Sequence, residues 1–158
     1  MLEMELDADE VLRTELTNYQ DLSHYTYLKG RDRNGVLFCQ RDKDTFTYLI
    51  NVICQDKWGE LPSIIVMKNP NNKTYVVWDG NHRVAVAKRY NLLLKAYLIE
   101  NQSDLNWARG QNKYVMWPNK LDHCLKILVS YCKCSGEESS VLREELLEKN
   151  PLKVDLTA

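Results

Sequence analysis

The sequence predicts an α/β protein in which a small mixed sheet packs against helices, followed by a C-terminal helical extension. Three features predict this class: an apolar stripe with helical spacing over 44–57, a strand–turn–strand pattern over 63–78, and a helix at 82–90 that leads into a third apolar run at 92–99. The chain has 158 residues, enough for one domain with a substantial core.

The N-terminal part is less regular than the centre. Residues 2–16 carry apolar side chains at a loosely helical spacing, which predicts a short helix. Residues 18–35 are rich in Tyr, Asn, Gly and charge, which predicts a loop or short strand that ends in an Asn34–Gly35 turn. A further strand is expected at 35–39.

The first central element is a helix from Asp44, a suitable N-cap, to about Lys57. Gly59 is expected to stop it. One face of this helix carries an apolar stripe, which consists of Phe46, Leu49, Ile50, Ile53 and Cys54.

A hairpin and a second helix follow. The run SIIVM at 63–67 does not alternate polar and apolar residues, which predicts a strand buried on both faces. A turn at 69–72 joins it to a strand at 73–78. The helix at 82–90 has small Ala residues that allow close packing on the sheet, and Asn91 ends it.

Beyond the third strand the pattern weakens. A helical turn is expected to begin at Ser103, an apolar linker at 114–118 to pack on the core, and helices to form at 121–133 and 137–148. Five residues near 121–134 have side chains of the types that bind zinc: Asp122, His123, Cys124, Cys132 and Cys134. Their spacing fits no common zinc pattern, so packing of the cysteines in the core is favoured. We place the main domain at 1–118, with its core at 44–110, and the extension at 119–158.

Composition and charge argue against several classes of protein. The chain is 44% apolar and 27% charged, as soluble proteins are, and no apolar run reaches the roughly 20 residues that span a bilayer. We therefore expect no membrane partner. The N-terminus MLEMELDADE lacks the features of a secretory signal, and five cysteines without one predict reduced thiols, so the expected location is cytoplasmic. A net charge of −1 disfavours the broad basic face that non-specific DNA binding needs.

The turn Asp79-Gly80-Asn81-His82-Arg83 carries the candidate chemistry. It joins a predicted strand to a predicted helix, and the start of a helix offers unpaired N–H groups and a partial positive charge to an anion. Gly80 allows close approach of the backbone, and Asn81 or His82 can cap the helix. Arg83 can donate two hydrogen bonds to a phosphate, and His82 can act as an acid or base near neutral pH.

Asp79 does not fit simple anion binding, because a carboxylate repels phosphates. Its presence indicates either a Mg²⁺ ion that shares phosphate ligands or general-base catalysis. A purely structural alternative also stands, in which an Asp-Gly turn is followed by His and Arg side chains that only cap and solvate the helix.

The stretch from Asp44 to Gly110 resembles the ParB/sulfiredoxin superfamily. Its members share a helix, a strand opened by Pro, a hairpin, a Gly-x-x-Arg type signature at a helix start and a following strand. The corresponding segments here are FTYLINVICQDKWGELPSIIVM, NKTYVVWDGNHRVAVAKRYNL and LKAYLIENQSDL. The resemblance implies the fold of that superfamily for 44–110.

The superfamily's branches imply different activities. Sulfiredoxins carry Gly-Gly-Cys-His-Arg, and Asn81 stands in the slot of their nucleophilic Cys, so sulfinic-acid repair is not expected. His82 and Arg83 match position for position, and in the family such residues hold nucleotide phosphates. Sulfiredoxins also use a Lys and a Ser, one turn apart on the preceding helix, where this chain has Thr45 and Tyr48.

Two further branches keep other parts of the signature. ParB partition proteins bind CTP with Mg²⁺ through Gly-Glu-Arg-Arg and continue into a helix-turn-helix domain, whereas residues 121–149 here allow only two short helices. Free-serine kinases carry an Asp-Gly-His-Thr-Arg type signature and transfer phosphate to a small hydroxyl compound. Asp79-Gly80-x-x-Arg83 is most similar to that branch, or to phage and plasmid proteins with an Asp-Gly-x-His-Arg turn.

The resemblance implies a protein that binds a nucleoside triphosphate, ATP or CTP, with Mg²⁺ and hydrolyses it or transfers its phosphate. In that role Asp79 and His82 are catalytic, Asp79 binds the metal, and Gly80, Asn81, His82 and Arg83 bind the nucleotide. Two alternatives stay open: a ParB-like DNA-binding or nuclease accessory protein, and a non-catalytic phage- or plasmid-type module that binds a host protein.

Overall fold

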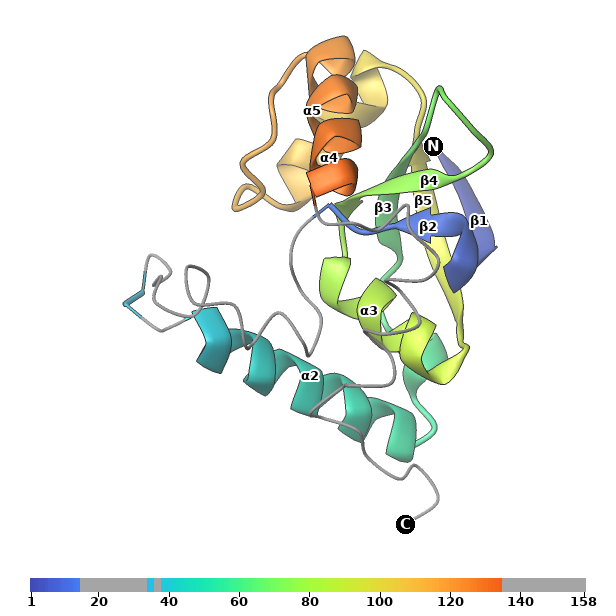
Figure 1. Cartoon of the computed structure of the whole chain (residues 1–158), viewed down its shortest axis with the longest axis vertical. Helices are drawn as coiled ribbons and strands as arrows, with labels where there is room; N and C mark the ends of the chain where they lie inside the picture. The colour runs from blue at the N-terminus through green and yellow to red at the C-terminus, as the bar shows by residue number, and fades with distance from the viewer. Residues whose placement is uncertain (15–33, 36–37, 135–158) are drawn as a thin grey trace.

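Five strands form one curled mixed sheet in the computed structural model, which describes residues 1–14, 34–35 and 38–134 (Figure 1). In spatial order across the sheet the strands are β1 (Leu2–Asp7), β5 (Leu93–Ile99), β3 (Ile64–Lys68), β4 (Tyr75–Asp79) and β2 (Val11–Leu12). Strands β1 and β5 are antiparallel, β5 and β3 parallel, β3 and β4 antiparallel, and β4 and β2 parallel. The expected class, a small mixed sheet packed with helices, is confirmed at this level.

The hairpin β3–β4 lies at the centre of the sheet. On β3, Ile64 and Val66 are buried on one face, whereas Ile65 and Met67 are buried on the other. The prediction of a strand covered on both faces is therefore confirmed. The pairing shifts register between Ile65 and Val66, where β4 reaches its end. Such irregularities re-aim the side chains at strand ends.

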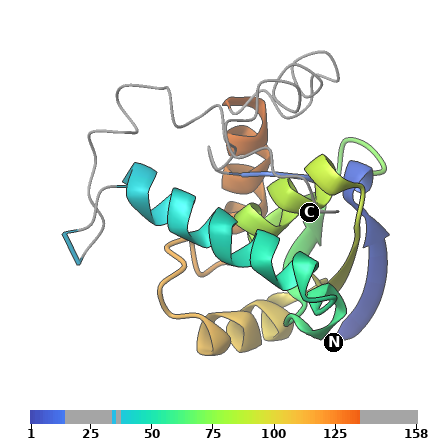
Figure 2. The same ribbon diagram turned by 90° about the horizontal axis from the view of Figure 1, so that it is seen from below.

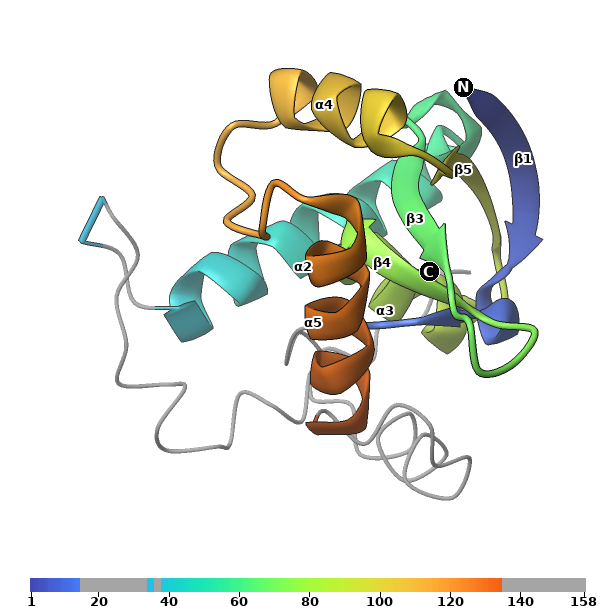
Figure 3. The same cartoon turned by 90° about the horizontal axis from the view of Figure 1, so that it is seen from above.

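Helices cover both faces of the sheet. On one face lies α3 (Asn81–Tyr90), and α2 (Phe38–Cys54) packs outside it (Figure 2). The opposite face is covered by α4 (Gln102–Gln111) and α5 (Leu121–Cys134), as Figure 3 shows. Two short 3₁₀ turns, η1 (Ala8–Glu10) and η3 (Trp58–Glu60), complete the described elements.

The N-terminal helix expected over 2–16 is wrong for the described residues, which form β1, η1 and β2 instead. In LEMELD the apolar Leu2, Met4 and Leu6 alternate with acidic residues, and Leu6 is buried against the sheet. Positions 2 and 6 satisfy both a helical and a strand spacing. Pairing with β5 decides in favour of the strand, as tertiary context often does.

Helix α2 begins earlier and ends earlier than expected. Phe38 and Cys39 are helical, so a strand over 35–39 is wrong for these two residues. Asp44 lies inside the helix and accepts a hydrogen bond from Gln40 at 2.8 Å, so it is not the N-cap. The helix ends before Gly59, because Asp56 takes a left-handed φ of 58°. Of the predicted stripe, Phe46, Leu49 and Ile50 are buried as expected and Ile53 is partly buried, whereas Cys54 at its end is exposed.

The C-terminal half keeps most of its expected elements. Helix α4 is a full helix rather than a single turn, and the side chain of Asn101 caps it by accepting from the N–H of Asp104 at 2.9 Å. Helix α5 matches the range 121–133, whereas the helix expected at 137–148 lies outside the described residues, as do 18–33. Cys124 and Cys132 are buried in the core between α5 and the sheet. The described residues contain no group of three His, Cys, Asp or Glu side chains that could hold a metal ion.

None of the helices in the described ranges is long and apolar enough to cross a membrane.

Candidate functional site

The turn between β4 and α3 depends on a single glycine. Gly80 is the N-cap of α3 and has a φ of 124°, which side chains of L-residues rarely tolerate. A Cβ atom at this position would lie 2.5 Å from Cγ2 and 2.8 Å from Cβ of Ile64 on β3. Gly80 therefore lets the start of α3 press against the central strand.

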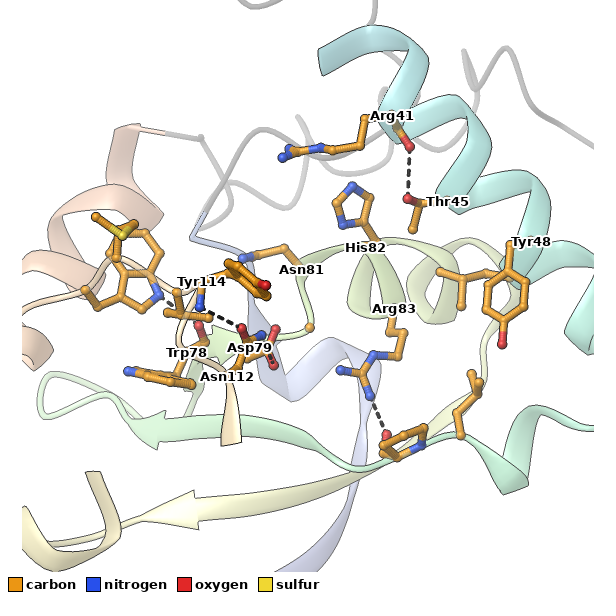
Figure 4. A pocket seen from close by; sticks show the side chains of 17 residues that line it. Arg41, Thr45, Tyr48, Trp78, Asp79, Asn81, His82, Arg83, Asn112 and Tyr114 are labelled. Atoms are coloured by element: carbon orange, nitrogen blue, oxygen red, sulfur yellow. Dashed lines mark hydrogen bonds between the residues drawn. The ribbon is translucent and has the colours of Figure 1, made fainter. Parts of the chain in front are cut away.

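A cavity of about 520 Å³ opens beside this turn (Figure 4). Helix α2 contributes one wall, the approach to β3 a second, and the loop between α4 and α5 a third. The residues that line the cavity are Arg41, Thr45, Tyr48, Leu49, Leu61, Pro62, Trp78, Asp79, Gly80, Asn81, His82, Arg83, Asn112, Tyr114, Val115, Met116 and Trp117. All five residues of the predicted turn are thus brought to one cavity.

Arg83 is partly buried at the edge of the cavity. One guanidinium nitrogen donates a hydrogen bond to the carbonyl oxygen of Pro62, where the chain enters β3. Burial lowers the pKa of Arg83 from its usual value, whereas the negative charge of Asp79 opposes that shift. A guanidinium has five N–H donors, and the bond to Pro62 uses only one nitrogen of the fork. Arg83 therefore brings a partly desolvated positive charge to the cavity.

His82 and Arg41 add two more basic groups from different elements. The ring of His82 packs against Phe46 of α2, with the ring centroids 5.3 Å apart. This contact restricts the orientation of the imidazole. Arg41 projects from α2 on the same side of the cavity (Figure 4). Thr45, one turn further on, donates its hydroxyl to the Arg41 carbonyl oxygen at 2.9 Å.

Asn81 departs from its expected role as cap or ligand-binding side chain. Helix α3 has no side-chain cap. The Asn81 amide instead accepts from the Thr14 N–H at 2.8 Å and donates to the Thr14 hydroxyl at 3.3 Å. That hydroxyl in turn donates to the Val77 carbonyl oxygen at 2.8 Å. Because both residues are buried, the Asn81 side chain joins the N-terminal segment to the turn.

Asp79 is tied to the loop after α4. Its Oδ2 atom accepts a hydrogen bond from Nδ2 of Asn112 at 3.1 Å, and Oδ1 of Asn112 accepts from the Tyr114 N–H at 3.1 Å. Further along the loop, the Trp117 indole donates to the Trp78 carbonyl oxygen at 2.8 Å. The loop is therefore anchored to the end of β4 at two points.

Asp79 is the one carboxylate among the described residues that line the cavity. A single carboxylate cannot form an all-protein cage for Mg²⁺, but Mg²⁺ is commonly held by one or two carboxylates together with substrate phosphates and water. The residues present therefore fit a metal that arrives with a phosphorylated ligand, and not a metal held by the protein alone.

Comparisons of the chain with protein-family models, curated proteins and solved structures found no match. The local motif pointed to the turn, but three other contributors were missed: Arg41, Asn112 and the loop at 114–117. Residues 114–118 were expected to form an apolar linker that packs on the core, and no motif includes Arg41 or Asn112. Only the tertiary arrangement brings these segments to Asp79.

Proposed function

We propose that the cavity binds a nucleoside triphosphate, with its phosphates at the start of α3. One observation carries this proposal: a cavity of about 520 Å³ gathers Arg41, His82 and Arg83 around a helix N-terminus that has no side-chain cap. Unpaired N–H groups and the helix dipole favour an anion there. Because the chain as a whole has a net charge of −1, the two arginines in this cavity are a local feature and not part of a generally basic surface.

Each basic residue has a separate task in this proposal. Arg83 gives hydrogen bonds from a partly desolvated guanidinium, which are stronger than those of an exposed one. His82 donates to a phosphate oxygen or transfers a proton. Arg41 contacts the phosphates from α2, so that they lie between α2 and α3.

Asp79 is the residue that we propose takes part in the reaction of the bound phosphates. A bound Mg²⁺ would neutralise developing charge on the phosphates, and Asp79 is the residue that would hold it. In this proposal the same carboxylate, which accepts a hydrogen bond from Asn112, also takes a proton from an attacking hydroxyl or water. The proposed activity is Mg²⁺-dependent hydrolysis or phosphoryl transfer. Membership of the ParB/sulfiredoxin superfamily is part of this proposal, and sulfinic-acid repair is excluded from it because Asn81 is no nucleophile.

Thermal unfolding of the full chain tests the proposal, with ATP, CTP, GTP and ADP each added with and without Mg²⁺. Arg41→Ala and Lys43→Ala form a matched pair, because both remove one positive charge from α2 and only Arg41 lines the cavity. We expect at least one nucleotide to raise the melting temperature of the wild type and of Lys43→Ala. That nucleotide should bind Arg41→Ala about tenfold more weakly than the wild type, which is the usual effect of losing a hydrogen bond from a charged group. The proposal fails if no nucleotide stabilises the wild type.

A further inference from the structure

The loop at 112–117 presents two apolar side chains to solvent at the margin of the cavity. Tyr114 is 67% exposed and Met116 81% exposed, whereas their neighbours Val115 and Trp117 pack on the core. Large apolar groups on a surface cost little singly. Here they border a cavity whose other features already point to a ligand.

The exposure of Tyr114 is built into the fold. Its backbone N–H donates to Oδ1 of Asn112, and the Val115 N–H donates to the Asn112 carbonyl oxygen at 3.3 Å. The carbonyl oxygen of Trp117 accepts from Arg109 of α4 at 2.7 Å. These bonds hold the loop so that the Tyr114 ring stands at the cavity, on the side of Asp79 and Asn112 (Figure 4).

The cavity is larger than phosphates alone require. Its volume of about 520 Å³ falls within the range of about 300–1,000 Å³ that is typical of pockets for small organic ligands. Basic groups line the part next to α3, and the wall from Tyr114 to Trp117 is apolar and aromatic. A ligand that matches both parts carries an anionic group and a flat, weakly polar ring.

We propose that Tyr114 is the stacking face for the base of the bound nucleotide, so that the ligand is recognised by its ring as well as by its phosphates. This inference rests on the proposed function. Base–aromatic stacking tolerates different bases, because every base has a π-face. It distinguishes a nucleotide from an inorganic polyphosphate, which has no ring.

Calorimetric titration of the full chain tests the inference, with two ligands compared in Mg²⁺: the nucleotide that stabilises the wild type most, and inorganic tripolyphosphate. Tyr114→Phe keeps the ring and Tyr114→Leu removes it. We expect Tyr114→Leu to lose about tenfold or more in affinity for the nucleotide, with tripolyphosphate affinity unchanged. Tyr114→Phe should bind both ligands as the wild type does. Thermal unfolding without ligand checks that each variant is folded.

Tyr48 provides the control for position, because it is 58% exposed and lines the same cavity from α2. Loss of nucleotide affinity in Tyr48→Leu but not in Tyr114→Leu would overturn the inference, as would an equal loss for both ligands in Tyr114→Leu. Unchanged nucleotide affinity in Tyr114→Leu would overturn it as well. If the wild type bound neither ligand, the proposed function would fail and this inference with it.

Discussion

Thr14 and Asn81 form a buried pair that joins the N-terminal segment to the turn at the candidate site. The Thr14 side chain is 1% exposed and that of Asn81 6% exposed, and the Thr14 N–H donates to the Asn81 amide at 2.8 Å. The Thr14 hydroxyl also bonds the Val77 carbonyl oxygen. Buried hydrogen bonds thus join the segment that follows β2 to the strand β4 and to the start of α3.

Asn81→Ala should destabilise the protein, because it leaves the buried Thr14 N–H without its acceptor. The expected loss in the free energy of unfolding is about 1–3 kcal/mol, measured by urea denaturation. Asn119→Ala, at an exposed position, should change it by less than about 0.5 kcal/mol. Equal stabilities of the two variants would contradict the structural role given to Asn81.

Gly80→Ala should destabilise the protein more strongly. The left-handed backbone costs a non-glycine residue about 1–3 kcal/mol, and the new Cβ would collide with Ile64. Gly110→Ala is the matched control, since this glycine lies in α4 with open space around its would-be Cβ. That variant should gain up to about 1 kcal/mol from helix propensity. A harmless Gly80→Ala would mean that the turn has a different backbone.

Asp79→Asn separates the two roles proposed for the carboxylate. The variant can keep its bond to Asn112 through the amide oxygen, so the fold should persist. Without Mg²⁺, nucleotide affinity should be equal or higher, because a negative charge beside the phosphates is gone. If Asp79 holds the metal, the gain in affinity that Mg²⁺ provides should fall at least about tenfold. A Mg²⁺ effect as large as in the wild type, together with lost turnover, would show that Asp79 acts only as a base.

The Cys124 thiol should make stability depend on pH in the alkaline range. Burial raises its pKa from 9.0 to about 11, although the Trp78 indole and Arg109 oppose the shift. Above pH 9 the unfolded chain loses this proton while the folded chain keeps it, so stability falls as the pH rises from 9 to 11. Urea denaturation across this range measures the effect, and Cys124→Ala should reduce the slope. An identical slope in that variant would contradict the assignment.

The sequence predicted the elements around the turn well, because their signals are local. The run at 63–67 lacks alternation, Asn69 and Pro70 favour a turn, and Asn91 takes the left-handed φ of 55° that ends α3. The coarse fold class follows from these elements. The edge strand β1 was missed because its pairing with β5 joins residues far apart in the chain.

The candidate site was predicted only in part, for the same physical reason. Asp79 to Arg83 are contiguous, so a motif can reveal them. Tyr114 and Asn112 reach the site only because α4 packs on the sheet and its following loop turns back to β4. No local sequence pattern predicts that this loop contacts β4. The buried partner of Asn81 was equally hidden, since Thr14 lies 67 residues away in the chain.

The most direct test of the central claim is a crystal structure of the full chain with Mg²⁺ and a non-hydrolysable nucleoside triphosphate analogue. The account predicts phosphate oxygens within hydrogen-bonding distance of the first backbone N–H groups of α3 and of the Arg83 guanidinium, with Arg41 closing over them. A nucleotide bound elsewhere on the chain, with the cavity beside Gly80 empty, would contradict it.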